Sequence, residues 1–191
     1  MGAHAHQLVL QRLEGLEAGG VCGVVKHMPG HGRAAVDSHA ELPVVDADEQ
    51  ALAVDLAPFR ALHDAPMGMV AHILYPAWDP DRCASRSPLI VEEVIRRRIG
   101  FDGLLMSDDT SMNALKGTIG ERAARIVGGG CDIVLHCNGV MDEMKAVVKE
   151  AIPLGGEALR RAKAVEAAFG RGDGLSEEAV RAEFQGLLAV S

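Results

Sequence analysis

The sequence predicts an α/β protein built around a sheet of parallel strands, with helices in the connections between them. Four short runs rich in valine, isoleucine, leucine and methionine are nearly continuous rather than alternating, which is typical of strands buried on both faces. Stretches with helical periodicity separate these runs, so the pattern repeats as strand and then helix. No linker rich in proline or serine divides the 191 residues, which favours one domain. The expected strands are residues 21–25, 67–74, 103–106 and 131–135.

Capping residues mark where the helices begin and end. Asp46 and Asp48 are candidate N-caps for one helix, and Pro88 suits the first turn of another. Gly100 stands where a glycine commonly ends a helix, and Ser176 is a candidate cap for the last one. The expected helices are residues 3–18, 46–62, 88–98, 140–152, 157–169 and 177–190.

The charge balance argues against a nucleic-acid partner. With 19 basic and 27 acidic residues the formal net charge is −8, and aromatic residues make up 3% of the chain, so neither a basic stripe nor a set of stacking side chains is present. No apolar run reaches the roughly 18 to 20 residues that a membrane-spanning helix needs, and the opening residues do not resemble a signal peptide. We therefore expect a cytoplasmic protein with no membrane partner.

The cysteines favour the same compartment. They show no CxxC spacing, and three of the four fall inside apolar segments, so we expect reduced thiols rather than disulfides. They are Cys22, Cys83, Cys131 and Cys137.

Each predicted strand carries polar, reactive residues at its carboxyl end. In open parallel sheets and in βα barrels alike, these ends form the active face, so the pattern indicates an enzyme. The alternative is that strand ends are polar only because they meet water. The residues are Lys26 and His27, His72 and Tyr75, Ser107 to Asp109, and His136 and Asn138.

The segment that follows the first strand contains two candidate chemistries. His27 and His31 are four residues apart, but Pro29 and Gly30 lie between them, so the helical geometry that would let the pair bind a metal is absent. A flexible loop with a carboxylate and histidine pair fits better. In the triplet Asp37-Ser38-His39, the carboxylate can fix one imidazole nitrogen and leave the other to exchange a proton with substrate.

The third strand ends in adjacent carboxylates, Asp108 and Asp109. A carboxylate at this position can attack an anomeric carbon and form a glycosyl ester that water later releases. Neighbouring side chains on an extended segment point in opposite directions, so only one of the two can be the nucleophile. The alternative is that Asp109 caps the following turn and Asp108 is merely exposed.

Five motifs in this order resemble those of the NagZ-type β-N-acetylhexosaminidases of glycoside hydrolase family 3. The resemblance runs from about residue 15 to residue 138. The motifs are residues 26–32 (KHMPGHG), 37–43 (DSHAELP), 55–59 (DLAPF), 71–75 (AHILY) and 107–112 (SDDTSM).

The resemblance implies a (β/α)8 barrel and a retaining double displacement on terminal β-linked N-acetylglucosamine, as found in peptidoglycan-derived fragments. It implies that Asp108 is the nucleophile and that His39, assisted by Asp37, is the general acid/base. Lys26 and His27 match residues that hold the sugar hydroxyl groups. No metal or organic cofactor is expected.

The strand count departs from that family, because a full barrel needs eight strands and about 250 residues. We therefore expect a partial barrel of about four C-terminal βα units with terminal helices, forming a single domain over residues 1–191. Such a half barrel, from a truncated or split form, should leave two strand edges and one sheet face uncovered, and should pair with itself or with a missing N-terminal half. Two alternative functions stay open: a glycoside phosphorylase, and an inactive half-barrel remnant that acts only as an assembly partner.

His72 and His136 are weaker candidates, which could line the pocket or could be structural. Residues 128–130 (GGG) follow a helix and lead into a strand, the reverse of a phosphate-binding loop, so they are expected to form a helix end and turn.

Overall fold

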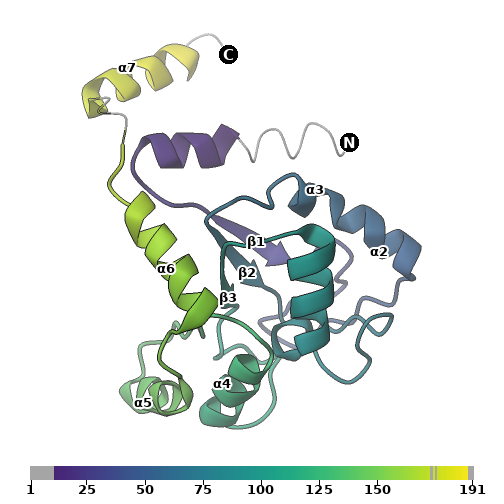
Figure 1. Ribbon diagram of the computed structural model, residues 1–191. Helices are drawn as coiled ribbons and strands as arrows, with labels where there is room; N and C mark the ends of the chain where they lie inside the picture. Colours follow the sequence, from purple (N-terminus) through teal and green to yellow (C-terminus); the bar gives the residue numbers. More distant parts are fainter. Residues whose placement is uncertain (1–10, 173, 175, 189–191) are drawn as a thin grey trace.

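The computed structural model describes residues 11–172, 174 and 176–188 of the chain (Figure 1). Residues 11–18 are helical, and the earlier part of the expected opening helix and the end of the last one lie outside the described residues. The elements that follow are β1 (Val24–Met28), α2 (Glu49–Asp55), α3 (Ala57–Arg60), β2 (Met67–Val70), η1 (Ala84–Arg86), η2 (Ile90–Ile99), β3 (Leu104–Ser107), α4 (Ile119–Gly128), α5 (Met141–Glu150), α6 (Gly156–Ala168) and α7 (Glu177–Leu188).

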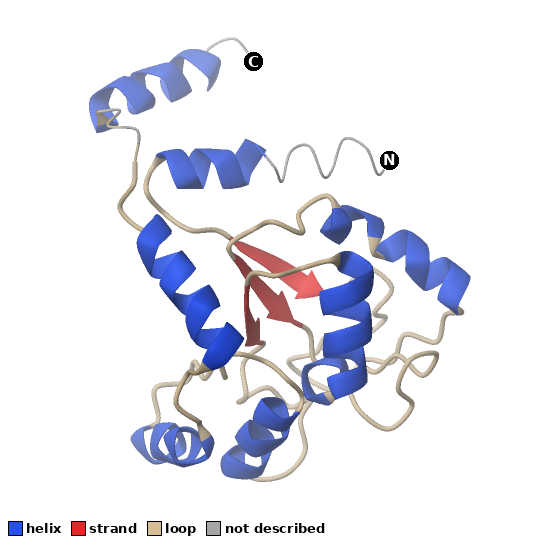
Figure 2. Cartoon of the chain, in the orientation of Figure 1, coloured by secondary structure: helices blue, strands red, loops and turns tan. Residues whose placement is uncertain are grey.

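The sheet is parallel, as predicted, and has three regular strands in the order β1-β2-β3 (Figure 2). The first strand begins three residues later than expected, at Val24, so it includes Lys26 and His27. The second ends earlier, at Val70. The α/β class is confirmed, whereas the partial barrel stays a prediction.

The predicted fourth strand, 131–135, is not a regular strand. It lies parallel to β3 through a single bridge between Met106 and Ile133. Two side chains replace ladder bonds there: the Asp132 carboxylate accepts the Leu105 N–H at 2.9 Å, and the Leu135 N–H donates to Ser107 Oγ at 3.2 Å. These polar side chains take two of the backbone partners, so the backbone pairing with β3, such as the Ser107 N–H to the Ile133 carbonyl at 3.0 Å, is interrupted and does not continue as a regular strand.

Two predicted helices also differ from expectation. The helix capped by Asp48, whose carboxylate accepts the Ala51 N–H at 2.8 Å, ends at Asp55, and α3 follows with Pro58 in its first turn. Proline has no N–H to continue the α2 ladder, so the single predicted helix becomes two. The helix after Pro88 is wound as a π-helix over 90–99, and it ends at Gly100, whose φ of 84° suits a residue without a side chain.

Helices lie on both sides of the sheet (Figure 1). The larger core packs α2, α3 and η2 against one face, and there the Phe101 ring lies over Gly68, where a Cβ would approach Phe101 Cζ to 2.8 Å. The opposite face packs against α6 through Met67, Leu104 and Val165. The expectation of an uncovered sheet face is therefore met only in part, because α6 covers the amino-terminal end of this face, while Met69 and Met106 further along it are only partly buried.

Buried charges fix α6 and η2 to the amino-terminal end of β3. Asp132 binds Arg96 at 2.8 Å and Arg161 at 3.2 Å, and their side chains are 6%, 11% and 14% exposed. Arg96 also donates to the carbonyl oxygens of Phe101 and Gly103. Within the described residues, no helix is long and apolar enough to cross a bilayer.

Asp132→Ala should lower the free energy of unfolding by roughly 3 to 5 kcal/mol, because it leaves two buried arginine side chains without their shared carboxylate. Denaturant unfolding measures this loss. Asp142→Ala is the matched control, since Asp142 is 94% exposed and its ion-pair contact is with the exposed Lys145 at 3.7 Å. Equal losses in the two variants would contradict the structural role of Asp132.

Candidate active site

A pocket of ≈ 430 Å³ lies at the carboxyl ends of β1 and β3, where the loop after β1 closes over the sheet. All five residues that the sequence singled out for catalysis or sugar binding line it, together with two that reasoning from the sequence did not place there. The lining residues are Lys26, His27, His31, Asp37, Ser38, His39 and Asp108.

Asp108 stands directly after β3 and is held from both sides. Its N–H donates to the Val70 carbonyl at 2.9 Å, which continues the pairing of β3 with β2. One carboxylate oxygen, Oδ1, accepts the Asp109 N–H at 2.9 Å, while Oδ2 lies 3.6 Å from His27 Nε2. The side chain of Asp108 is 15% exposed. The hydrogen bond anchors Oδ1, and Oδ2 is left on the side of His27, in the pocket.

The surroundings of the His27 imidazole favour its neutral form. Burial lowers its pKa below the ordinary value, and the Asp108 carboxylate offsets only part of that effect. The His31 ring packs edge-on against it, with 5.5 Å between the ring centroids. A neutral imidazole beside a carboxylate can hydrogen bond to sugar hydroxyl groups.

Asp37 and His39 form the pair that the sequence predicted. One oxygen of Asp37, Oδ1, accepts both the His39 backbone N–H and the Nδ1–H of its ring, each at 2.9 Å. These two hydrogen bonds lower the pKa of Asp37, so its ionised carboxylate holds Nδ1 of His39 as the donor and leaves Nε2 to exchange a proton. His39 is 78% exposed, so the pair stands at the pocket rim.

Two further contacts hold the rim loop in place. His31 Nε2 lies 3.4 Å from the hydroxyl of Ser38, which is buried, and the Asn113 N–H donates to the His39 carbonyl at 3.3 Å. Both His31 and Ser38 lie inside the motifs that carry the family resemblance. Their position inside these motifs was the feature of the sequence from which their place in the pocket could have been predicted.

Asp109 turns away from the pocket. Its carboxylate accepts the N–H groups of Ser111 at 3.0 Å and Cys137 at 3.1 Å, and it also binds the Ser111 hydroxyl. This is the capping role considered for it from the sequence. The sequence also allowed that Asp108 is only an exposed strand-end residue. Its side chain is anchored by a hydrogen bond and mostly buried, which does not fit that alternative.

His72 and His136 do not line this pocket. His72 is fully buried, accepts from Ser85 Oγ at Nδ1 (2.7 Å) and donates from Nε2 to the Asp109 carbonyl (3.0 Å). The His136 Nδ1 pairs with Thr110 Oγ1 at 2.7 Å, and its Nε2 faces Glu143 at 3.3 Å. Both rings therefore lie outside the candidate pocket, and the buried Nε2 of His136 has no hydrogen-bond partner among the described residues.

No metal centre is apparent in the described part of the chain, where no group of three or more potential His, Cys, Asp or Glu ligands comes together. Three of the cysteines, Cys22, Cys83 and Cys131, are buried, and Cys137 is exposed.

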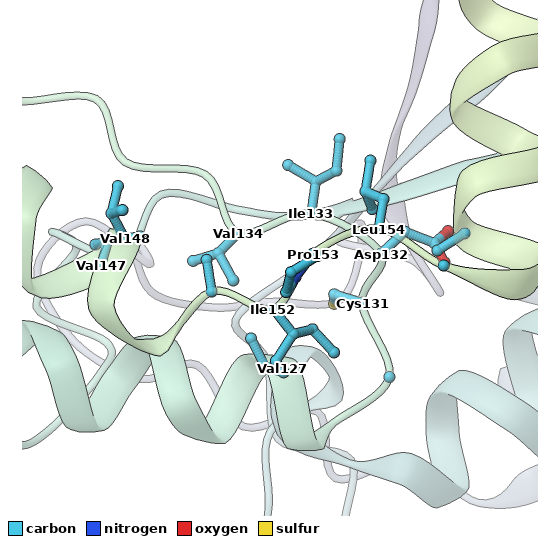
Figure 3. A pocket seen from close by; sticks show the side chains of 14 residues that line it. Val127, Cys131, Asp132, Ile133, Val134, Val147, Val148, Ile152, Pro153 and Leu154 are labelled. Atoms are coloured by element: carbon cyan, nitrogen blue, oxygen red, sulfur yellow. The ribbon is translucent and has the colours of Figure 1, made fainter.

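A second hollow, of ≈ 460 Å³, lies between the 131–134 segment, α5 and the loop 151–155 (Figure 3). Its lining is almost wholly apolar, with side chains such as Val148, Ile152 and Leu154. The only charged lining residue is Asp132, whose carboxylate is already bound to Arg96 and Arg161. The lining also contains the buried thiol of Cys131, and burial raises the pKa of this thiol, which keeps it protonated.

Comparison with known proteins agrees with the geometry. The family model described as glycosyl hydrolase family 3 N terminal domain matches residues 2–165. The chain belongs to glycoside hydrolase family 3. This family assignment confirms the resemblance recognised in the sequence motifs.

Curated relatives in the family are bacterial β-hexosaminidases. One from Methylobacillus flagellatus is 38% identical over 138 residues, which are 70% of this chain and 39% of the relative. One from Neisseria meningitidis serogroup C is 41% identical over 146 residues, 73% of this chain and 40% of the relative. This family 3 chain thus spans about two fifths of their length.

Solved structures show the same similarity in three dimensions. NagZ from Neisseria gonorrhoeae in complex with N-trifluoroacetyl-D-glucosamine matches with a TM-score of 0.72 and 35% identity, covering 94% of this chain and 51% of that one. A family 3 β-N-acetylglucosaminidase from Paenibacillus sp. str. FPU-7 matches with a TM-score of 0.78 and 29% identity, covering 90% and 36%.

The buried His72 makes a specific prediction about acid stability. Burial lowers its pKa from 6.5 to about 4, so the unfolded chain takes up this proton at a higher pH than the folded chain. The stabilisation from a neutral His72 is complete above pH 6.5 and is lost as the pH falls towards 4, by about 3 kcal/mol in all.

Unfolding free energies measured between pH 7 and 4 test this slope. His72→Gln should flatten it, whereas substituting the exposed His63 by glutamine should leave it unchanged. An unchanged slope in His72→Gln would show that His72 is not the group responsible.

Proposed function

We propose that this chain carries the catalytic groups of a retaining exo-β-N-acetylglucosaminidase, a β-N-acetylhexosaminidase that acts on terminal β-linked N-acetylglucosamine. The observation that carries the proposal is the pocket itself. It brings together a single anchored carboxylate, Asp108, and the hydrogen-bonded Asp37–His39 pair. A nucleophile and a separate proton carrier are the two groups that a double displacement needs.

In the first step, Asp108 Oδ2 attacks the anomeric carbon while the bond to the leaving oxygen breaks. His39, as the imidazolium stabilised by ionised Asp37, gives the proton from Nε2 to that oxygen and becomes neutral. The product of this step is a glycosyl ester on Asp108 and a free alcohol.

In the second step, neutral His39 takes a proton from water, and the resulting nucleophile attacks the same carbon. The ester bond to Asp108 breaks, the sugar leaves with retained configuration, and His39 is again an imidazolium. Lys26 and His27, which line the same pocket beside Asp108, hold the sugar hydroxyl groups.

The proposed natural substrates are N-acetylglucosamine-containing muropeptides or related glycosides derived from peptidoglycan, and the proposed location is the cytoplasm. Support for the sugar comes from the names of the relatives: curated β-hexosaminidases, and a solved NagZ in complex with an N-trifluoroacetyl-glucosamine. The pocket adds chemical support, because its histidine and lysine side chains can hydrogen bond to sugar hydroxyl groups.

We also propose that the active form is an assembly in which further strands complete the sheet, supplied by a second copy or by a complementary half barrel. Among the described residues, β1 pairs only with β2, and the 131–135 segment borders only β3. The apolar hollow lined by Val148, Ile152 and Leu154 adjoins this second edge. Sizing chromatography tests the idea, and a monomer with robust turnover would contradict it.

A mechanism-based fluorosugar should label Asp108, because its activated ester forms on the nucleophile and hydrolyses slowly. Peptide mass spectrometry locates the label. Asp108→Ala should lose about 10⁴-fold or more in turnover of an aryl N-acetyl-β-glucosaminide and should take up no label. The exposed Asp142→Ala variant is the matched control, and a label on Asp109 would overturn the assignment.

Removing His39 should slow substrates with poor leaving groups by about 10²- to 10⁴-fold and activated aryl glycosides far less, because only the former need a proton during bond cleavage. Asp37→Asn should act in the same direction but more mildly, since the imidazole is still present. Rates measured across a series of leaving groups give the comparison. Equal losses across the series would count against an acid role for His39.

The same assay, run in phosphate buffer, separates the proposed hydrolase from a glycoside phosphorylase. A histidine that becomes neutral repels an incoming phosphate less than a carboxylate would, which is the feature that favours the phosphorylase. Release of free N-acetylglucosamine supports hydrolysis, whereas release of N-acetylglucosamine 1-phosphate supports phosphorolysis. An assembly without either product would favour the inactive remnant.

A further inference from the structure

The carboxylate of Asp109 is fully occupied by the protein itself. It accepts hydrogen bonds from the Ser111 N–H at 3.0 Å, the Cys137 N–H at 3.1 Å and the Ser111 hydroxyl. Burial alone would raise the pKa of Asp109, but these hydrogen bonds outweigh it and hold the pKa below its ordinary value. The group is therefore an ionised clamp between the end of β3 and the segment after residue 135.

The backbone of Asp109 is fixed as well. Its carbonyl oxygen accepts the Nε2–H of the fully buried His72 at 3.0 Å, and the other nitrogen of that ring is bound to Ser85 Oγ at 2.7 Å. Because both the side chain and the carbonyl are held, the residue has little freedom to rotate about its backbone dihedrals.

The remaining polar group of Asp109, its N–H, acts on the neighbouring residue. It donates to Asp108 Oδ1 at 2.9 Å, and this bond leaves Oδ2 of Asp108 directed towards His27, at 3.6 Å, and towards the pocket. If Asp109 moved, this N–H would move with it and the Asp108 carboxylate would lose its orientation.

From these contacts we propose that Asp109 is a positioning residue, whose clamped carboxylate fixes the backbone N–H that orients the Asp108 nucleophile. The inference rests on the proposed role of Asp108 in catalysis, but the orientation itself can be measured without turnover. A merely structural Asp109 would affect stability and leave the orientation of Asp108 unchanged.

The pKa of the His27 ring is a measure of that orientation, because the ring lies 3.6 Å from the Asp108 carboxylate. The main charges acting on it belong to the pocket and do not include Asp109, so its titration is sensitive to where the Asp108 carboxylate lies. NMR titration of the His27 ring in the unsubstituted chain and in Asp108→Asn defines the full effect of the Asp108 charge.

Asp109→Ala removes the clamp and should move the His27 pKa downwards by at least half of that full effect. Asp109→Asn is the matched control, because it removes the same charge but keeps a side-chain oxygen for the two N–H groups. It should move the His27 pKa by less than a quarter of the full effect. Equal shifts in the two variants would mean that the charge acts directly, and no shift in a folded Asp109→Ala chain would overturn the proposal.

Should Asp109→Ala fail to fold, Ser111→Ala takes its place, since it removes one hydroxyl from the clamp. It should shift the His27 pKa in the same direction by a smaller amount, and an unchanged His27 titration in that variant would overturn the proposal.

Kinetics on a catalytically active assembly provide the second readout. Asp109→Ala should lower kcat by about 10- to 100-fold with KM within about two-fold, because misplacing the attacking oxygen affects the reaction step rather than sugar binding. Asp109→Asn should restore most of that loss. Absence of turnover in the unsubstituted protein would contradict the proposed function, while the His27 titration would still decide the role of Asp109.

Discussion

The parallel hydrogen-bond ladder of the sheet is the constraint on which the candidate site depends. Met28 pairs with Val70, and Val70 pairs with Ser107, so the three strands end level with one another. Side chains that follow different strands are thereby brought to one edge. A shift of one residue in the register of β3 would turn Asp108 to the opposite face of the sheet, away from His27.

The two ends of the sheet use charge in different ways. At the amino-terminal end, Asp132 is surrounded by two arginines and by the Leu105 N–H, so its charge is neutralised inside the protein and ties η2 and α6 to β3. At the carboxyl end, Asp108 has no arginine or lysine partner within ion-pair distance among the described residues. A carboxylate that is anchored but not neutralised keeps an oxygen available for bond formation, which fits the proposed chemistry of the site.

Local environment assigns different roles to chemically identical residues. His39 stands in solvent at the rim with one nitrogen fixed by Asp37, which suits proton transfer, whereas His72 is enclosed with both nitrogens hydrogen bonded and its pKa lowered to about 4. Asp108 and Asp109 divide in the same way. Alternation of side chains along an extended backbone sends one into the pocket and the other into the protein, where it can support its neighbour.

The sequence by itself determined the α/β class and the parallel direction of the strands, because apolar runs are local patterns, and its resemblance to family 3 pointed to five of the seven pocket residues but not to His31 and Ser38. The tertiary structure alone decided how polar groups that are far apart in the chain pair with one another. The fourth run could not be recognised as irregular, since the side chains that interrupt it, Asp132 and Ser107, bind backbone groups across the space between two segments. Nor could the sequence show that α6 packs against Met67 and Leu104 on the second face of the sheet or that Cys137 helps to hold Asp109. These contacts join residues far apart in the chain, and only the folded backbone sets their distances.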